Sequence, residues 1–263
     1  MTEQSGDPGS ASAVRTFQVR GRTWSEKETA LHRKKGYGGF AYFPFGPKSE
    51  VTADFVRDLP DLRYVAVGGN MGDDSAIFEL DSLEALFLDY TSRRPADLSR
   101  VAQSVQRIHF GWRPDFRMPT SPQLTKAFFS RWAAKDLSFL EEQPQLQELK
   151  IELKRKHTMS ALGGPRLPRL TELEFLLGTV ADLADAEFPP SLERIIFHGV
   201  SDVDLGFVRR LPALQWLDLE KCTVRSLKPL DDCPSPSLRG VSHYKAVVAD
   251  GDMSPLDRFK KDA

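Results

Sequence analysis

The chain has 263 residues, of which 36 are Lys or Arg and 37 are Asp or Glu, so its formal net charge is −1. This balance argues against a strongly basic nucleic-acid-binding protein and against a polyanionic tail. Hydrophobic residues make up 40% of the chain, enough to bury a sizeable core, which argues against global disorder.

Cysteine content and apolar runs indicate where the protein works. Cys222 and Cys233 are too few for a disulfide framework or for a zinc site built from cysteine, so we expect a reducing compartment. The sequence contains no run of about 18 apolar residues, so no membrane-spanning helix is predicted. Residues 1–13 lack the basic and apolar regions of a secretory signal, and we expect a disordered tail. From these features we expect a cytoplasmic location and no contact with a membrane.

Residues 14–39 are predicted to form an N-terminal cap. The segment 16–24 can add a strand. Ser25 followed by Glu28 is a capping-box pattern that opens a helix, and Gly36 ends it.

Between residues 40 and 244 a short pattern recurs about every 22 residues. Apolar residues occupy its first, fourth and sixth positions, as in Leu62-Val65-Val67 and Leu214-Leu217-Leu219. Other copies start at residues 40, 83, 105, 124, 146, 170, 192 and 238. An apolar residue or a proline precedes many copies in the same phase, which marks a turn into a strand.

The clearest copy, Leu211 to Leu230, reads LPALQWLDLEKCTVRSLKPL and places Cys222 where the leucine-rich repeat family has Asn or Cys. The chain thus resembles that family, in its class of short repeats of about 22 residues. The resemblance implies an α/β fold: a leucine-rich repeat solenoid (horseshoe) with a parallel concave sheet of about ten strands and short helices or turns on the convex side. Arg113 and other residues depart from the family's ladder position, so we expect no continuous asparagine ladder.

Return segments between strands are less regular. Residues 95–104 and 130–143 have helical spacing, the latter with Trp132 toward the core. Residues 111–123 contain three prolines and no periodicity, and predict a protruding loop or a distorted repeat. After a last strand within 241–248, residues 245–263 form a C-terminal cap in which Ser254 starts a short charged helix.

Catalytic motifs are absent from the sequence: it has no phosphate loop, dinucleotide fingerprint, zinc-protease helix or nucleophile elbow. We therefore expect no catalytic residues, no metal and no cofactor. His243 is expected to point inward, and Cys222 to be a buried ladder residue. An alternative is an enzyme, or the regulatory subunit of one, with a site near the 111–123 loop or beside His109.

The third, fifth and seventh positions of each strand should face solvent. They are aromatic in the first half of the chain and acidic in the second. With two residues at the rim, the candidate partner-binding residues are Tyr42, Tyr64, Phe87, Tyr90, His109, Trp112, Phe128, Glu148, Glu172, Glu174, Arg194, His198, Trp216, Asp218 and Glu220.

Exposed aromatic residues are typical of binding hot spots, although rings on neighbouring strands can also pack on one another as cross-strand pairs. The acidic residues favour a protein partner with a basic surface, or they serve solubility alone. The family resemblance implies non-catalytic protein recognition through the concave face. A more specific hypothesis is an intracellular inhibitor or immunity-type protein; another is carbohydrate or peptide binding on the aromatic half. The basic runs are too short to predict nucleic-acid binding.

Overall fold

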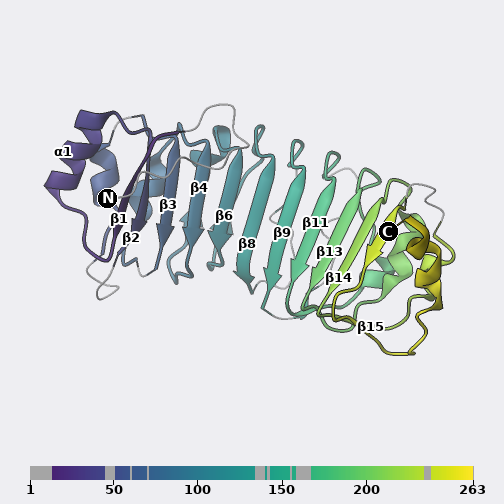
Figure 1. Ribbon diagram of the computed structural model, residues 1–263. Coiled ribbons are helices and arrows are strands. Elements are labelled where there is room, and N and C mark those ends of the chain that lie inside the picture. The colour runs from purple at the N-terminus through teal and green to yellow at the C-terminus, as the bar shows by residue number, and fades with distance from the viewer. Residues whose placement is uncertain are drawn as a thin grey trace. The chain divides into compact units, whose positions relative to one another are not determined.

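The computed structural model describes residues 14–44, 51–59, 61–69, 71–133, 140, 143–154, 156–157, 167–233 and 238–262. The predicted disordered tail, residues 1–13, lies outside them. The chain divides into two compact units, Met1–Leu124 and Thr125–Ala263. Each unit is built on parallel strands joined by short 3-10 helices and turns (Figure 1).

The first unit contributes five parallel strands in the order β1-β2-β3-β4-β6. Their bounds are β1 (Thr16–Arg20), β2 (Gly39–Phe43), β3 (Tyr64–Gly68), β4 (Ala85–Asp89) and β6 (Arg107–Gly111). The short strands β5 (Ala96–Asp97) and β7 (Phe116–Arg117) pair separately. The connections contain the 3-10 helices η2 (Asp54–Asp58), η3 (Ser75–Glu79) and η4 (Val101–Gln103).

The helix α1 (Glu26–Lys35) lies beside β1 at the N-terminal end of this unit (Figure 1). It begins with the predicted capping box: the Ser25 side chain accepts from the Glu28 backbone N–H, and the Ser25 backbone N–H donates to the Glu28 carboxylate, to which the Ser25 hydroxyl also donates. It ends at Gly36, whose φ of 62° is left-handed and therefore suits glycine. The predicted helix and its two caps are confirmed.

The second unit contributes six parallel strands in the order β8-β9-β11-β13-β14-β16. Their bounds are β8 (Lys126–Trp132), β9 (Glu148–Leu153), β11 (Glu172–Leu176), β13 (Arg194–His198), β14 (Trp216–Glu220) and β16 (Gly240–Ser242). Two small pairs lie apart from them, β10 (Lys156–His157) with β12 (Thr179–Val180) and β15 (Thr223–Val224) with β17 (Val247–Val248). The 3-10 helices are η8 (Leu183–Asp185), η9 (Leu205–Arg210), η10 (Lys228–Leu230) and η11 (Ser254–Asp262).

Strand register follows the predicted repeat alignment within each unit. In the first unit Tyr64 pairs with Ala85, and Ala85 with Arg107. In the second unit the pairing runs from Glu148 through β11, β13 and β14 to Gly240. From the repeat that starts at residue 62 to the one that starts at 214, the first, fourth and sixth positions are buried and form the core, because apolar side chains on alternate positions of a strand share one face.

The first repeat is an exception to the predicted register. Phe40 pairs with Val65 and Tyr42 with Val67, three residues away from the predicted alignment of this repeat. The outward position is taken by Gly39, where a Cβ would lie 2.7 Å from Cβ of Tyr64 on the next strand. Only glycine fits there without displacing the neighbouring strand, and its place sets Phe40 and Tyr42 inward.

Two return segments also differ from the prediction. Residues 130–132 continue strand β8 rather than start a helix, although Trp132 is buried as expected. Of 95–104, only Val101–Gln103 forms a 3-10 helix, preceded by β5. No helix in the described residues is long and apolar enough to cross a membrane.

The predicted α/β fold class is confirmed. The two units contribute five and six parallel repeat strands, with 3-10 turns as the usual return elements. The return segments tighten to 3-10 helices because each has only a few residues between buried anchors, too few for an α-helix.

Candidate functional site

The second unit carries three rows of outward side chains, which together we name the exposed strand face. Strands β9, β11, β13 and β14 alternate strictly between buried and more exposed residues. Pairing aligns the outward residues across the strands. Row one is Lys126, Glu148, Glu172, Arg194, Trp216 and Gly240; row two is Phe128, Lys150, Glu174, Ile196, Asp218 and Ser242; row three is Glu152, Leu176, His198 and Glu220.

Most carboxylates in rows one and two are matched by a cation on a neighbouring strand. Lys126 Nζ lies 2.7 Å from Glu148 Oε1, and Lys150 Nζ lies 2.9 Å from Glu174 Oε1. The Lys150 ammonium also lies 5.4 Å from the centre of the Phe128 ring. The acidic stretch predicted from the sequence is therefore a set of ion pairs, each of which contributes little to stability because it is partly exposed.

Glu172 is matched least well. Within the described residues its ion pair is with Arg194, whose Nη1 lies 3.8 Å from Oε2. The same guanidinium is committed to Asp218, with Nε at 2.9 Å and Nη2 at 2.8 Å. Burial raises the pKa of the Glu172 carboxyl; Arg194 lowers it, the like charges of Glu148 and Glu174 raise it, and Lys126 lowers it. Among the carboxylates of rows one and two, Glu172 therefore has the longest contact with its cation.

Trp216 is the large apolar side chain of the face, with 47% of its surface exposed. Its indole lies over Gly240 on the neighbouring strand, where a Cβ would approach Cζ3 to 2.3 Å. Glycine at this position leaves the strand surface bare, so the ring rests on backbone. The result is an aromatic platform beside the Arg194–Asp218 pair.

The third row ends in a second charged group. His198 Nδ1 lies 3.1 Å from Glu220 Oε2, and Lys221 Nζ lies 3.2 Å from Oε1 of the same carboxylate. The Lys221 hydrogen bond and the charge of His198 lower the pKa of Glu220. Glu220 is thus held as a carboxylate at neutral pH.

In the first unit the predicted aromatic residues pack on one another. The rings of Tyr64 and Phe87 lie 5.4 Å apart, and those of Phe87 and His109 lie 6.4 Å apart in an edge-to-face arrangement. All three side chains are half-buried. His109 Nε2 lies 3.6 Å from Asp89 Oδ1. This is the cross-strand packing named above as the alternative to a binding surface.

Two candidate residues do not reach the exposed surface. Tyr42 is 1% exposed, because of the register difference in β2, and its hydroxyl accepts a hydrogen bond from the Trp24 backbone N–H. Tyr90 is 5% exposed, and its hydroxyl donates to Asp74. Their placement on an exposed face is wrong. Trp112 is half-buried.

The segment 111–123, predicted as a protruding loop or a distorted repeat, is packed within the first unit. Arg113 is buried and forms an ion pair with Asp74, and Ser121 donates a hydrogen bond to the carbonyl of Ala102 at 2.6 Å. β7 within this segment pairs with β5. These contacts indicate a distorted repeat rather than a protruding loop.

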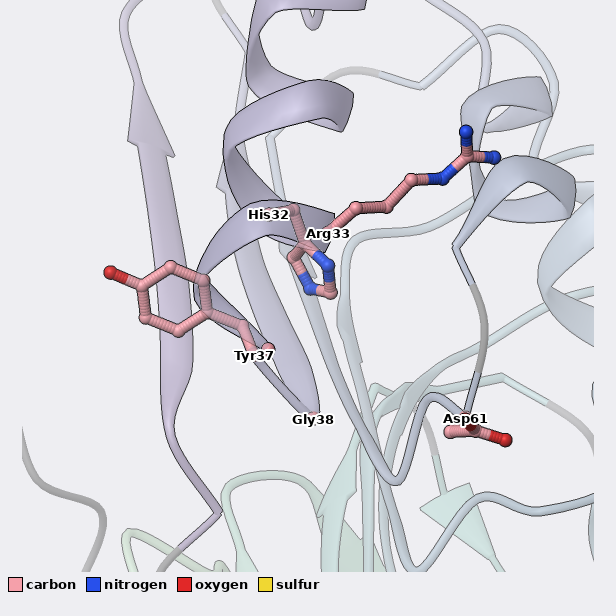
Figure 2. A pocket seen from close by; sticks show the side chains of 6 residues that line it. His32, Arg33, Tyr37, Gly38 and Asp61 are labelled. Carbon is pink, nitrogen blue, oxygen red and sulfur yellow. The ribbon is translucent and has the colours of Figure 1, made fainter.

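A pocket in the first unit is lined by His32, Arg33, Gly36, Tyr37, Gly38 and Asp61. Figure 2 shows the Arg33 side chain extending away from the His32 ring, and its Nε donates to the Asp58 carbonyl at 2.7 Å. His32 is buried, its Nε2 lies 3.3 Å from the Gly39 carbonyl, and burial lowers its pKa. The polar groups do not converge, as they would in a typical ligand site.

The other residues considered for metal binding or reactivity do not form a site in the described part of the chain. No group of three or more His, Cys, Asp or Glu in the described part of the chain is placed to hold a metal ion. Cys222 is buried as predicted, and burial raises the pKa of its thiol to about 11, whereas Cys233 is half-buried. His243 is exposed, so the inward position predicted for it is wrong.

Two residues that shape this surface, Gly240 and Lys221, are not predicted from the sequence. Gly240 occupies the third position of the last repeat and is not among the candidate residues, yet it carries the Trp216 ring. Lys221 follows the last strand residue and so falls outside the repeat positions, yet it pairs with Glu220. The repeat alignment places Gly240 opposite the exposed aromatic residue Trp216, and this pairing is the sequence signal that could have identified it.

Comparison with known proteins extends the fold assignment. No protein-family model matches the chain, and no curated protein matches it in sequence. An internalin from Listeria monocytogenes has a similar structure, with a TM-score of 0.51 and 12% identity, over 90% of this chain and 74% of the internalin chain. The fold is an internalin-like leucine-rich repeat solenoid. At this identity the likeness concerns the fold alone.

Proposed function

We propose that this chain is a leucine-rich repeat protein that binds a protein partner through the exposed strand face of its second unit, without catalysis. The observation that carries the proposal is Trp216, a large ring held on Gly240 with nearly half of its surface exposed. Tryptophan is among the residues that dominate binding energy at protein interfaces. An exposed ring on a rigid strand also loses little conformational entropy when a partner covers it.

The charges around the ring support the same proposal. Arg194 and Asp218 pair beside Trp216, and Glu172 on the next strand adds a carboxylate whose contact with Arg194 is longer, at 3.8 Å. Such a surface favours a partner with a basic patch and gives an association rate that falls with salt. An inhibitor that covers a basic enzyme surface would meet this description. Both cysteines are free, which agrees with a cytoplasmic setting.

The experiment is an affinity capture from lysate of the source organism at two salt concentrations. Wild type is compared with Trp216→Ala, and with Tyr244→Ala as the matched control. Tyr244 is 55% exposed and follows β16, at the seventh position of the last repeat rather than beside Trp216 in row one. Circular dichroism first establishes that all three proteins fold.

We expect a protein that wild type and Tyr244→Ala retain and that Trp216→Ala loses. Removal of an interface anchor typically weakens binding by about 2 kcal/mol or more, close to thirtyfold. Retention of the same proteins by all three variants, or by none, would refute the proposal.

A further inference from the structure

Glu172 and Trp216 are two positions in row one of the exposed strand face that remain accessible to a partner. Glu172 is 36% exposed, and the guanidinium it faces is already bonded to Asp218. Trp216 presents its free ring surface two strands away in the same row. An acidic site and an aromatic platform in one line are complementary to a cation and an apolar ring or chain on the partner.

The separation of these two sites follows from the sheet. Glu172 pairs with Arg194 and Arg194 with Trp216, so two strand spacings lie between them. At about 4.8 Å per strand, the distance is about 9.6 Å. A segment that crosses the strands would need matching side chains on one side at this interval.

A polyproline II segment meets this requirement. It has three residues per turn and rises about 3.1 Å per residue, so residues i and i+3 face the same side about 9.3 Å apart. In a β-strand, residues i and i+3 point to opposite sides. An α-helix places residues i and i+3 only about 4.5 Å apart along its axis, and its same-face pair i and i+7 about 10.5 Å apart, farther than the sheet requires.

We propose that the partner engages this face with an Arg-x-x-Pro segment in polyproline II conformation, the arginine on Glu172 and the proline on Trp216. This inference rests on the proposed function, because it concerns the same face. The arginine fork donates two hydrogen bonds to the Glu172 carboxylate, and the proline ring lies flat on the indole.

Arg194 selects the residues between these two anchors. It lies between Glu172 and Trp216 in row one, and Asp218 already accepts its hydrogen bonds. The x side chains of a polyproline II segment point to its other two sides, but the segment passes above this guanidinium, so a second basic residue there would add like charge near Arg194 and weaken binding. The segment therefore carries one arginine, with neutral or acidic residues at the x positions.

The test uses synthetic nine-residue peptides with a fluorescent label and measures fluorescence anisotropy with the full chain. The probe contains Arg-Ala-Ala-Pro. Its controls contain Glu-Ala-Ala-Pro, Arg-Ala-Pro-Ala and Arg-Lys-Ala-Pro. Protein variants are Glu172→Gln, Trp216→Ala and, as the matched loss of one charge, Glu193→Gln, which alters an exposed residue outside the rows.

We expect the probe to bind wild type and Glu193→Gln equally, and to bind Glu172→Gln and Trp216→Ala about tenfold or more weakly. All three control peptides should bind wild type more weakly than the probe does. Glu172→Arg should reverse the preference, so that Glu-Ala-Ala-Pro binds better than Arg-Ala-Ala-Pro. This reversal also shows that the variant retains its fold.

Equal binding of the probe and the spacing control, or equal binding by all protein variants, would overturn the inference. Absence of probe binding would overturn it as well. The proposed function fails separately: if lysate capture still depends on Trp216 while no peptide binds, the face binds proteins by another arrangement.

Discussion

Arg113 and Asp74 form an ion pair in the interior of the first unit, although 39 residues separate them in the chain. Arg113 Nη1 donates to Asp74 Oδ1 at 3.0 Å, and Nη2 donates to Oδ2. The guanidinium also lies 5.2 Å from the centre of the Tyr90 ring, whose hydroxyl donates to the same carboxylate. Segments that follow three successive strands are thereby joined by one polar cluster.

Loss of one partner in this cluster should be costly. Arg113→Met leaves the Asp74 carboxylate buried without its cation, and we expect a loss of about 3–5 kcal/mol in the free energy of unfolding. The double variant Arg113→Met/Asp74→Asn should lose less than the sum of the single variants, because no unpaired charge remains. Urea denaturation of the four proteins measures the coupling. Additive losses would contradict a coupled buried pair.

Gly240 is predicted to hold Trp216 in position. In Gly240→Ala the new methyl group would displace the indole, so the intrinsic fluorescence of Trp216 should change and partner capture should weaken. In a Trp216→Ala background the same glycine substitution should have almost no further effect on stability. Fluorescence spectra and urea denaturation test both statements. An unchanged spectrum in Gly240→Ala would show that the ring does not depend on the glycine.

His32 should make stability depend on pH. Burial lowers its pKa in the folded chain, so the unfolded chain takes up a proton on His32 at a higher pH than the folded chain does. Below about 6.5, stability should therefore decrease as pH falls, and this contribution should be fully present above that pH. His32→Gln keeps a donor for the Gly39 carbonyl but does not titrate.

The comparison is the urea midpoint of wild type and His32→Gln at pH 7.5, 6.5 and 5.5. We expect the difference between them to shift in favour of His32→Gln as pH falls. Glu28, whose pKa is lowered mainly by the Ser25 hydrogen bond, loses its own contribution only at lower pH. Parallel midpoints across this range would exclude His32 as the titrating group.

The two cysteines should react at different rates. Burial raises the pKa of Cys222 to about 11, whereas Cys233 is half-buried with its Sγ 3.6 Å from the Val208 carbonyl. Since the thiolate is the reactive form, iodoacetamide at pH 8 should label Cys233 first. Mass spectrometry of labelled peptides measures the order. Cys233→Ser should remain almost unlabelled until urea unfolds it; early labelling of Cys222 would show that its site opens readily.

The repeat could be predicted because burial alternates with residue position. Leu149, Leu173, Ile195 and Leu217 occupy the same inward position on four strands, and each is almost fully buried. A strand shifted by one residue would bring its apolar set to the surface, so the pattern fixes the register. The capping box at Ser25 was predictable for a similar reason, because two side chains satisfy two specific backbone donors.

The register of β2 could not be read in this way. Its sequence, GFAYF, offers apolar residues at both parities, so the pattern alone does not choose between them. The choice depends on Gly39, which must lie against the backbone of Tyr64. That contact joins residues distant in sequence and appears only once the strands are paired.

The pairing of charges at the candidate site could not be predicted from the sequence either. Glutamates in a row predict an acidic surface, yet Lys150 reaches Glu174 on the neighbouring strand, and Arg194 reaches Asp218 in the same way. Which carboxylate stays least matched depends on the reach of each side chain and on its geometry. The sequence therefore predicted the face, and the structure identifies Glu172 and Trp216 within it.

The most direct test of partner binding at the exposed strand face is hydroxyl-radical footprinting of the chain with its captured partner. Oxidation of Trp216 is compared with that of Met253, which is 39% exposed and lies outside the three rows. We predict that the partner protects Trp216 and leaves the oxidation of Met253 unchanged. Undiminished oxidation of Trp216 in a saturated complex would contradict the account, because the partner would then bind elsewhere.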